Sequence, residues 1–325
     1  MKRVARLSEH LQPSRCAAST AGKAPPSSSP SQQRCRVGVV GYGKVGQFMV
    51  ENIVARPELF ELVFVCDPVA ADAVRGASGV PEAAKLYDLD RFEEHCRGGG
   101  GIDLVVEVAH PDVSRKFGLR FLRVANYMVA STSVFADAAF EPALLAEARR
   151  ATGHGICLPS GALWGVRDLQ KMSDSGTLTG LHITIRKHPL SLKLLGQLKP
   201  ALERVLAEKQ PAETVLFEGS VRDLCPLAPN NVNTMATAAL AASSTLGFDG
   251  TRATLICDPR LTTMAIDVEA RGKPQPDGKP GLVVHSRRVN PSKPGAVTGM
   301  ATFQSFLRSL LMVAATPPGD GVHFY

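Results

Sequence analysis

The sequence lacks features that mark several other classes of protein. Its 325 residues contain no run of 18 apolar residues, so no membrane-spanning helix and no membrane partner are expected. The seven cysteines form no Cys-x-x-Cys pair, which excludes zinc-ribbon and thioredoxin-like sites, and we expect no bound metal. Cys66, Cys157 and Cys257 lie in apolar runs, which predicts buried, reduced thiols in an intracellular protein.

Most of the chain also lacks an excess of charge. The formal net charge is +7, but residues 1–36 hold seven Lys or Arg and only one acid. The remaining residues carry 30 bases and 29 acids, a net charge of +1. The basic character therefore belongs to the N-terminal segment, and we expect no nucleic-acid partner.

Residues 1–34 are rich in Ser, Ala, Pro and Arg and poor in acids, which predicts a disordered N-terminal extension. The same composition suits a mitochondrial transit peptide. However, prolines 13, 25, 26 and 30 would interrupt the amphipathic helix of such a peptide. We therefore expect a cytoplasmic protein whose extension is untargeted or precedes the true start, with a mitochondrial location as the alternative.

Short apolar runs alternate with helical patterns from Arg36 onward. Strands are expected near 37–40, 62–66, 104–109, 127–130 and 156–158, and helices near 45–56, 113–124 and 140–150. This alternation predicts an α/β fold with a Rossmann-type doubly wound parallel sheet covered on both faces. We assign residues 35–140 to this dinucleotide-binding domain.

The pattern changes after about Gly161. Leu181, Ile183 and Ile185 alternate with polar residues, which is typical of a half-buried strand. Further strands are expected near 214–217, 252–257, 266–269 and 282–285, with an Ala-rich helix near 234–243. We therefore predict a second, α+β substrate domain over 141–299, and a C-terminal helix within 300–325 that packs back on the first domain.

A Gly-x-Gly-x-x-Gly motif follows the first predicted strand and opens the first helix. Gly41 would permit a tight turn, Gly43 a close approach of the backbone to a pyrophosphate, and Gly46 close packing of helix on strand. The free amides and positive dipole end of the helix would hold the phosphates. The motif predicts a cofactor site formed by Gly41, Tyr42, Gly43, Lys44, Val45 and Gly46.

Asp67 lies 21 residues after Gly46, at the end of the second predicted strand. A carboxylate there can accept hydrogen bonds from the adenosine ribose hydroxyls and repel a 2′-phosphate, which favours NAD over NADP. The alternative is that Asp67 only begins an Asp-Pro turn.

The motifs together resemble those of the L-aspartate dehydrogenase family, most closely its vertebrate aspartate dehydrogenase domain-containing branch. The resemblance spans Arg36 to about Phe324. It is carried by ordered motifs at residues Val37–Gly43, Asp103–Pro111, Gly161–Gly165, Asn231–Ala236, Leu246–Gly250, Asn290–Pro291 and Pro294–Gly299.

The resemblance implies an NAD(P)-dependent oxidative deamination of L-aspartate to iminosuccinate, which hydrolyses to oxaloacetate. It also implies a homodimer and a link to NAD biosynthesis. By the family pattern Val134 and Asn233 contact the cofactor, and Ser160, Gly161 and Ala162 line the nicotinamide cleft. Ala109 and His110 follow the strand that should end beside the nicotinamide, so we include both in the cofactor site.

One departure from the family bears directly on catalysis. The family carries a catalytic histidine where this chain has Ala265, in a segment that is one residue shorter. A methyl group cannot exchange protons. Either another group serves, with His110, His285 and His188 as candidates, or the protein is a catalytically impaired NAD(P)-binding protein on the same fold.

A diacid substrate requires cationic or amide donors. Arg186 and Lys187, at the end of a predicted strand, are our first choice for a carboxylate clamp, followed by Arg287 and Arg288. Asn231 and Asn233 lie at the start of a helix, where capping would explain one of them and a ligand site would explain both. Trp164 is expected in the core or in the wall of the cleft.

Overall fold

The structure, a computed structural model, describes residues 34–97, 100–150, 152–208 and 212–325. The disordered extension predicted for residues 1–34 lies outside these ranges, apart from Arg34. None of the helices in these ranges has the length and apolar content that crossing a membrane requires. Cys66, Cys157 and Cys257 are buried and unpaired, which confirms that they are core thiols.

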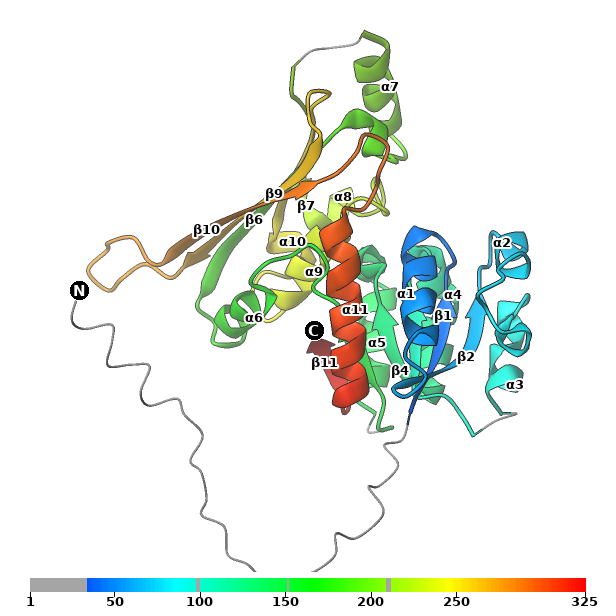
Figure 1. Cartoon of the computed structure of the whole chain (residues 1–325). Coiled ribbons are helices and arrows are strands. Elements are labelled where there is room, and N and C mark those ends of the chain that lie inside the picture. The colour runs from blue at the N-terminus through cyan, green and yellow to red at the C-terminus, as the bar shows by residue number, and fades with distance from the viewer. Residues whose placement is uncertain (1–33, 98–99, 151, 209–211) are drawn as a thin grey trace, which may run out of the picture. The chain divides into compact units, whose positions relative to one another are not determined.

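Six parallel strands form the first sheet (Figure 1). They are β1 (Cys35–Val40), β2 (Phe60–Cys66), β3 (Leu104–Glu107), β4 (Asn126–Val129), β5 (Gly155–Leu158) and β11 (Gly321–Phe324). Their order is β11-β5-β4-β3-β1-β2, so the chain reverses direction across the sheet between β1 and β3. Ligands of open α/β sheets bind at the carboxyl ends of the strands at such a reversal. The pairing confirms the predicted Rossmann-type sheet.

Helices cover both faces of this sheet because every second strand residue points to the opposite side. On one face α1 (Lys44–Val54) and α11 (Met300–Ala315) share a core with Val39 and Val106. On the other face α4 (Pro111–Val124) and α5 (Phe140–Ala148) pack on Val105 and Tyr127. The connections contain the short helices α2 (Ala71–Arg75), η1 (Glu82–Ala84), η2 (Leu89–Arg91), α3 (Phe92–Arg97) and η3 (Thr132–Ala136).

The parallel sheet extends beyond the domain boundary that we expected at residue 140. β5 pairs with β4, and β11 pairs with β5 at the far edge. Helix α11 lies against α1, where the Phe48 and Phe303 rings meet edge to face at 5.4 Å between centroids. By strand pairing the first domain therefore runs to Leu158 and includes the C-terminal helix and strand.

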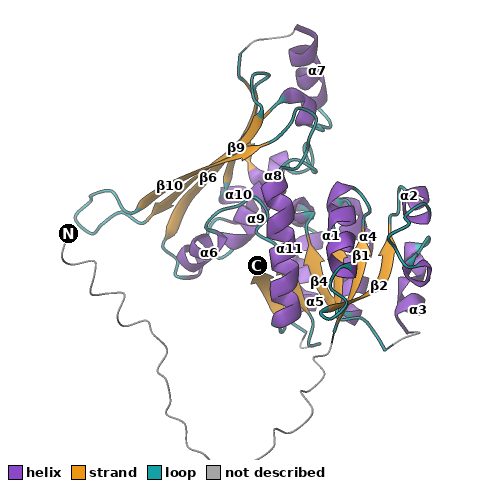
Figure 2. Cartoon of the chain, viewed as in Figure 1, coloured by secondary structure: helices purple, strands orange, loops and turns teal. Residues whose placement is uncertain are grey.

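The second sheet has five strands and is mixed, within the α+β domain that the sequence predicted (Figure 2). Its strands are β6 (Leu178–Lys187), β7 (Thr214–Ser220), β8 (Arg252–Cys257), β9 (Thr263–Gly272) and β10 (Val283–Pro291), in the order β10-β9-β6-β8-β7. Only β6 and β8 are parallel among these pairs. The accompanying helices are α6 (Val166–Asp174), η4 (Pro189–Ser191), α7 (Leu198–Glu208), α8 (Val221–Leu224), α9 (Asn233–Ala241) and α10 (Gly247–Gly250).

The two faces of the second sheet differ in polarity. Ile183 and Ile185 on β6 are buried in the same core as Met235 and Ala239 of α9. On the opposite face Arg186 forms an ion pair with Asp267 of β9. We call these the inner and the outer face, and the alternation along β6 decides which side chains reach the inner one.

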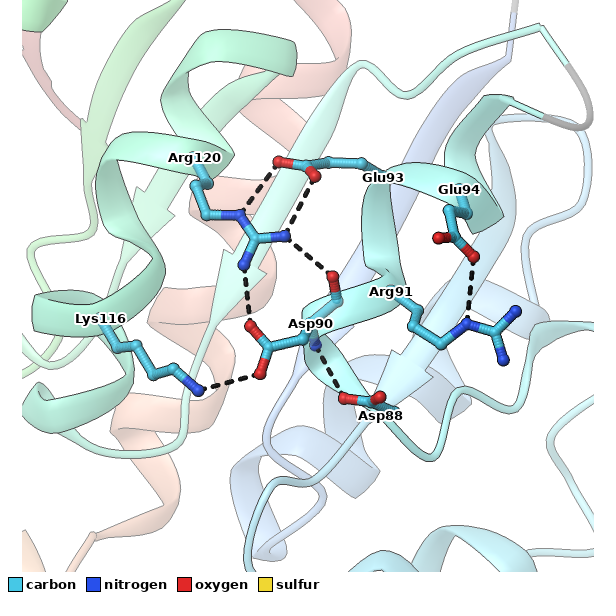
Figure 3. Close-up of polar contacts among 7 residues, drawn as sticks. All are labelled: Asp88, Asp90, Arg91, Glu93, Glu94, Lys116 and Arg120. Atoms are coloured by element: carbon cyan, nitrogen blue, oxygen red, sulfur yellow. Dashed lines mark hydrogen bonds and ion pairs between the residues drawn. The ribbon is translucent and has the colours of Figure 1, made fainter.

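A surface network ties helix α4 to the segment that follows β2 (Figure 3). Arg120 donates to both carboxylate oxygens of Glu93 and to Asp90, and Lys116 also donates to Asp90. The Arg120 hydrogen bond is the main reason that the pKa of Glu93 is lowered. The network lies away from the carboxyl edge of the sheet and is a structural feature of the first domain.

Candidate functional site

The glycine motif forms a tight turn between β1 and α1. Gly41 has a φ of 104°, which a side chain would strain, and an added Cβ would lie 2.8 Å from the Ala109 nitrogen. An added Cβ at Gly46 would lie 1.9 Å from the Gly41 oxygen. Both glycines are therefore required by close approach of backbone to backbone, as the sequence predicted.

Gly43 differs from its two neighbours in the motif, because a Cβ there would meet no atom within 4 Å. Among the described residues no acceptor is bound by the amides of Gly43, Lys44 or Val45, which open helix α1. Free amides at the positive end of an 11-residue helix form a cradle for an anion. The local geometry fits a cofactor diphosphate.

Asp67 holds the turn from the neighbouring strand end. Its Oδ2 accepts a hydrogen bond from the Tyr42 amide at 2.7 Å, and its Oδ1 accepts from the Val69 and Ala70 amides at 3.0 and 2.9 Å. The carboxylate therefore makes the Asp-Pro turn and braces the glycine turn at the same time. A carboxylate has about four acceptor positions in total, so one remains for a ribose hydroxyl.

The ends of β3 and β4 are held together by a fully buried carboxylate. Glu107 accepts hydrogen bonds from the Ala109 amide, the Ser131 amide and the Ser131 hydroxyl. Burial raises the pKa of Glu107 above its usual value, and these donors act in the opposite direction. His110 follows, and its Nδ1 accepts from the Asp112 amide as the N-cap of α4.

The second domain meets this edge of the first sheet through η3. Asn233, at the start of α9, accepts from the Ser133 amide through Oδ1, and its carbonyl accepts from the Thr132 hydroxyl. Its Nδ2 has no acceptor among the described residues, so it can donate to a cofactor. Val134 is fully buried, and its amide and carbonyl bond within the loop to Ser131 and Asp137.

A cavity lies between the carboxyl edge of the first sheet and the inner face of the second. It is lined by six of the residues predicted for the site, namely Ser160, Gly161, Ala162, Lys187, Asn231 and Asn233. Its remaining lining is Ala130, Pro159, Ile185, Asn230, Thr234, Thr237, Met264, Val297, Thr298, Thr302 and Phe306. Lys187 is the sole ionisable side chain among these described lining residues, and they include no carboxylate. The cavity is complementary to an anionic ligand.

Lys187 is the last residue of β6 and is buried, with 4% of its surface exposed. Its Nζ donates to the Val297 carbonyl at 3.0 Å. Among the described residues no acid lies within ion-pair distance of it. Burial lowers the pKa of Lys187 from its usual 10.5 to about 8.

Two buried donors near the start of α11 were not predicted from the sequence. Thr302 lies in the first turn of this helix and lines the cavity, and its buried hydroxyl has no partner among the described residues. Asn290 pairs with Met264 across β9 and β10, and its Nδ2 is also buried and unpaired. Arg288 donates to the Asn290 side-chain oxygen and to the carbonyl of Gly161, which lines the cavity. Of the two unpaired donors Thr302 lines the cavity, so its hydroxyl can donate to a carboxylate oxygen.

Two of the predicted substrate residues have other roles. Arg186 points to the outer face, where it pairs with Asp267 and Glu213, because it alternates with Lys187 along the strand. The clamp of two adjacent cations was therefore a wrong prediction. Asn231 lines the cavity, but its amide group bonds to the Lys193 amide and the Ser191 carbonyl and so fixes the chain after β6.

None of the three candidate histidines lines this cavity. His110 lines a second cavity, of about 770 Å³, which Ser133 and Ala136 of η3 also line. His188 caps η4 by accepting from the Leu190 amide, and His285 lies exposed on the outer face beside Glu269. Trp164 is 72% exposed, so it lies neither in the core nor inside the cleft.

Ala265 does not face the cavity either. Its cross-strand neighbours are Arg186 and Val289, which belong to the outer face. Met264, the residue before it, lines the cavity. Because side chains alternate along a strand, the shortened segment places the Met264 thioether in the cavity, at the position expected for the family histidine.

Together the fold and the site define a class: a Rossmann-type dinucleotide-binding domain joined to a mixed-sheet domain with an anion-complementary cavity between them. Residues 168–309 match the family described as "Aspartate dehydrogenase, C-terminal", and residues 41–159 match "Homoserine dehydrogenase, NAD binding domain". The aspartate dehydrogenase domain-containing protein of Xenopus tropicalis is 43% identical over 283 residues, which cover 86% of this chain and 95% of that protein. The chain belongs to the aspartate dehydrogenase family.

Two bacterial aspartate dehydrogenases extend this comparison. L-aspartate dehydrogenase 1 of Bordetella pertussis is 31% identical over 242 residues, or 73% of this chain and 83% of that protein. The crystal structure of aspartate dehydrogenase from Thermotoga maritima matches with a TM-score of 0.61 and 25% identity, covering 86% of this chain and 97% of that one. The family and its NAD-binding domain support a pyridine-nucleotide cofactor.

The register of β9 leads to a prediction about histidines at residues 264 and 265. In Met264→His the imidazole enters the cavity, so dicarboxylate binding should tighten about tenfold as the pH falls through about 6.5, where an imidazole becomes charged. Ala265→His places the ring on the outer face and should bind as the parent does. Isothermal titration calorimetry with succinate measures both. An equal effect in the two variants would contradict this register.

Proposed function

We propose that this protein catalyses the NAD(P)-dependent oxidative deamination of L-aspartate to iminosuccinate, which water converts to oxaloacetate. The observation that carries the proposal is the cavity at the carboxyl edge of the first sheet. Its described lining has one cation, several amides and hydroxyls and no acid. A diacid with an amino group matches those donors. The names of the bacterial relatives support the same substrate.

In this proposal each part of the chain has a separate task. The amides of Gly43, Lys44 and Val45 hold the cofactor diphosphate, and Asn233 orients its nicotinamide end. When bound, the nicotinamide supplies the hydride acceptor. The hydroxyl of Thr302 and the positive end of α11 bind one substrate carboxylate, and the fixed donors position the α-carbon.

The activity is tested with purified protein, L-aspartate and either dinucleotide at about pH 9, where a base of lowered pKa is neutral. We expect reduced cofactor to form with aspartate and not with malate or glutamate. Absence of turnover with all three, while dinucleotide binding persists, would contradict the enzyme and support a second candidate function, a catalytically impaired NAD(P)-binding protein. That candidate is favoured by the absence of histidine from the described cavity lining.

We also propose that NAD is preferred over NADP, because Asp67 places a negative charge at the end of β2 beside the glycine turn. Asp67→Ser should weaken NAD binding about 10- to 100-fold, because one charged hydrogen bond is lost. The ratio of NAD affinity to NADP affinity should therefore fall. Titration with each dinucleotide measures the ratio, and urea unfolding reports any loss of the turn. An unchanged ratio would show that Asp67 serves the turn alone.

The homodimer implied by the family resemblance remains a proposal. Val215 and Val289 lie exposed on strands of the second sheet, and a second copy packed there would cover them. Sedimentation equilibrium distinguishes monomer from dimer.

A further inference from the structure

The missing family histidine raises the question of which group handles protons in this cavity. Lys187 and Ile185 are the β6 side chains that reach it, since the strand alternates. The other described side chains that line the cavity with Lys187 are neutral, among them Met264 on β9, Val297 and Thr298 before α11, Thr302 on α11, Asn230 and Asn231 before α9, and Asn233 at its start. Arg288 does not line the cavity, and its guanidinium donates to the Gly161 carbonyl.

A lysine in this setting is costly to the fold when it is charged. Within the described part of the chain its one hydrogen-bond partner is the neutral Val297 carbonyl, which stabilises an ammonium less than a carboxylate would. A buried cation that no acid neutralises is typical of functional sites rather than of structural ones. The same burial keeps a fraction of Lys187 uncharged near neutral pH.

We propose that Lys187 is the proton acceptor of this site and takes the role that histidine has in the family pattern. The proposal rests on the function proposed above. In the step, one N–H bond of the substrate α-ammonium breaks and its electron pair stays on the substrate nitrogen. The Nζ lone pair forms the new N–H bond, so one proton and one positive charge pass from substrate to lysine. The charge of the cavity is unchanged, and the neutral amine can then give up its α-hydrogen as hydride.

The Val297 carbonyl fits this role because it fixes the position of Nζ without neutralising it. An acid partner at the same place would hold the lysine permanently charged and unable to accept a proton. The rival reading is that Lys187 stays charged and only binds a carboxylate. The two readings differ for arginine, which keeps the charge but cannot lose its proton.

The experiment compares Lys187→Arg, Lys187→Ala and the exposed control Lys199→Arg. For a proton acceptor, kcat of the parent rises with pH through about 8, Lys187→Ala loses about 10²- to 10⁴-fold, and small primary amines restore part of it. Lys187→Arg should remain as impaired as the alanine variant, and Lys199→Arg should match the parent. An arginine variant that keeps the parental rate and pH profile would overturn the proposal.

A second measurement needs neither cofactor nor turnover. In protein carrying ¹³C at the lysine ε-carbons, the signal that disappears in Lys187→Arg should titrate near pH 8, well below the remaining lysines. A titration near the ordinary lysine value would also overturn the proposal. The parent protein could turn over no diacid although this signal titrates near pH 8. In that case the proposed function is wrong, while the assignment of Lys187 as a buried amine of lowered pKa still holds. Isothermal titration calorimetry with succinate verifies that each variant keeps its cavity.

Discussion

Replacing Gly46 by alanine is expected to abolish dinucleotide binding and to lower the free energy of unfolding by about 3 kcal/mol or more. The added Cβ would lie 1.9 Å from the Gly41 oxygen and 2.7 Å from its carbonyl carbon. Both are backbone atoms of a turn that is itself fixed by a φ of 104°. Helix α1 must therefore move away from β1, which carries its free amides away from any bound diphosphate.

Gly43→Ala is the matched control for this prediction. Its Cβ meets no atom within 4 Å and its φ of −68° suits alanine, so urea unfolding should be nearly unchanged. The methyl group would nevertheless occupy the space in front of the free amides, so dinucleotide affinity should fall by about tenfold or more. Wild-type affinity in Gly43→Ala would mean that the phosphates do not lie at this turn.

Much of the first domain could be predicted because its signals are local. Apolar runs, a glycine turn and helical periodicity lie within short windows of sequence, and the structure reproduces them from β1 to β5. The C-terminal strand β11 was missed. It has four residues and depends on its pairing with β5, more than 150 residues earlier in the chain. Sequence windows do not contain that information.

The candidate site was predictable only in part, for the same reason. The glycine turn lies between β1 and α1, and Ser160–Ala162 and Asn233 line the cavity. Their contacts with a cofactor or substrate stay a prediction. Thr302 could not be found, because it reaches the cavity only when α11 packs back on the first domain. Arg186 and Lys187 could have been separated, since Lys187 continues the buried series Leu181, Ile183 and Ile185 and Arg186 does not. Lys187 stands at a strand position whose neighbours two and four residues earlier are buried and apolar, which predicts that it is buried too. Treating Arg186 and Lys187 as a pair because they are adjacent overlooks this pattern.

The buried lysine also predicts how stability depends on pH. Because the pKa of Lys187 is about 8 in the folded protein and 10.5 in the unfolded chain, the unfolded chain binds the extra proton between these values. Stability should therefore rise with pH from about 8 to about 10.5 and be lowest, for this group, below 8. At neutral pH the lowered pKa corresponds to a cost of about 3 kcal/mol, at about 1.4 kcal/mol for each pH unit.

Lys187→Met should remove that cost and leave the Val297 carbonyl without its donor, a loss of about 1 kcal/mol. The variant should thus be about 2 kcal/mol more stable than the parent at pH 7, and the difference should vanish or reverse near pH 10.5. Urea unfolding at both pH values measures it, and other groups that titrate in this range are common to both proteins and cancel. A variant that is less stable at pH 7 would mean that the ammonium is well solvated or paired in the fold. It would then carry its charge at no cost, and the physical reason for a neutral amine in this cavity would be lost.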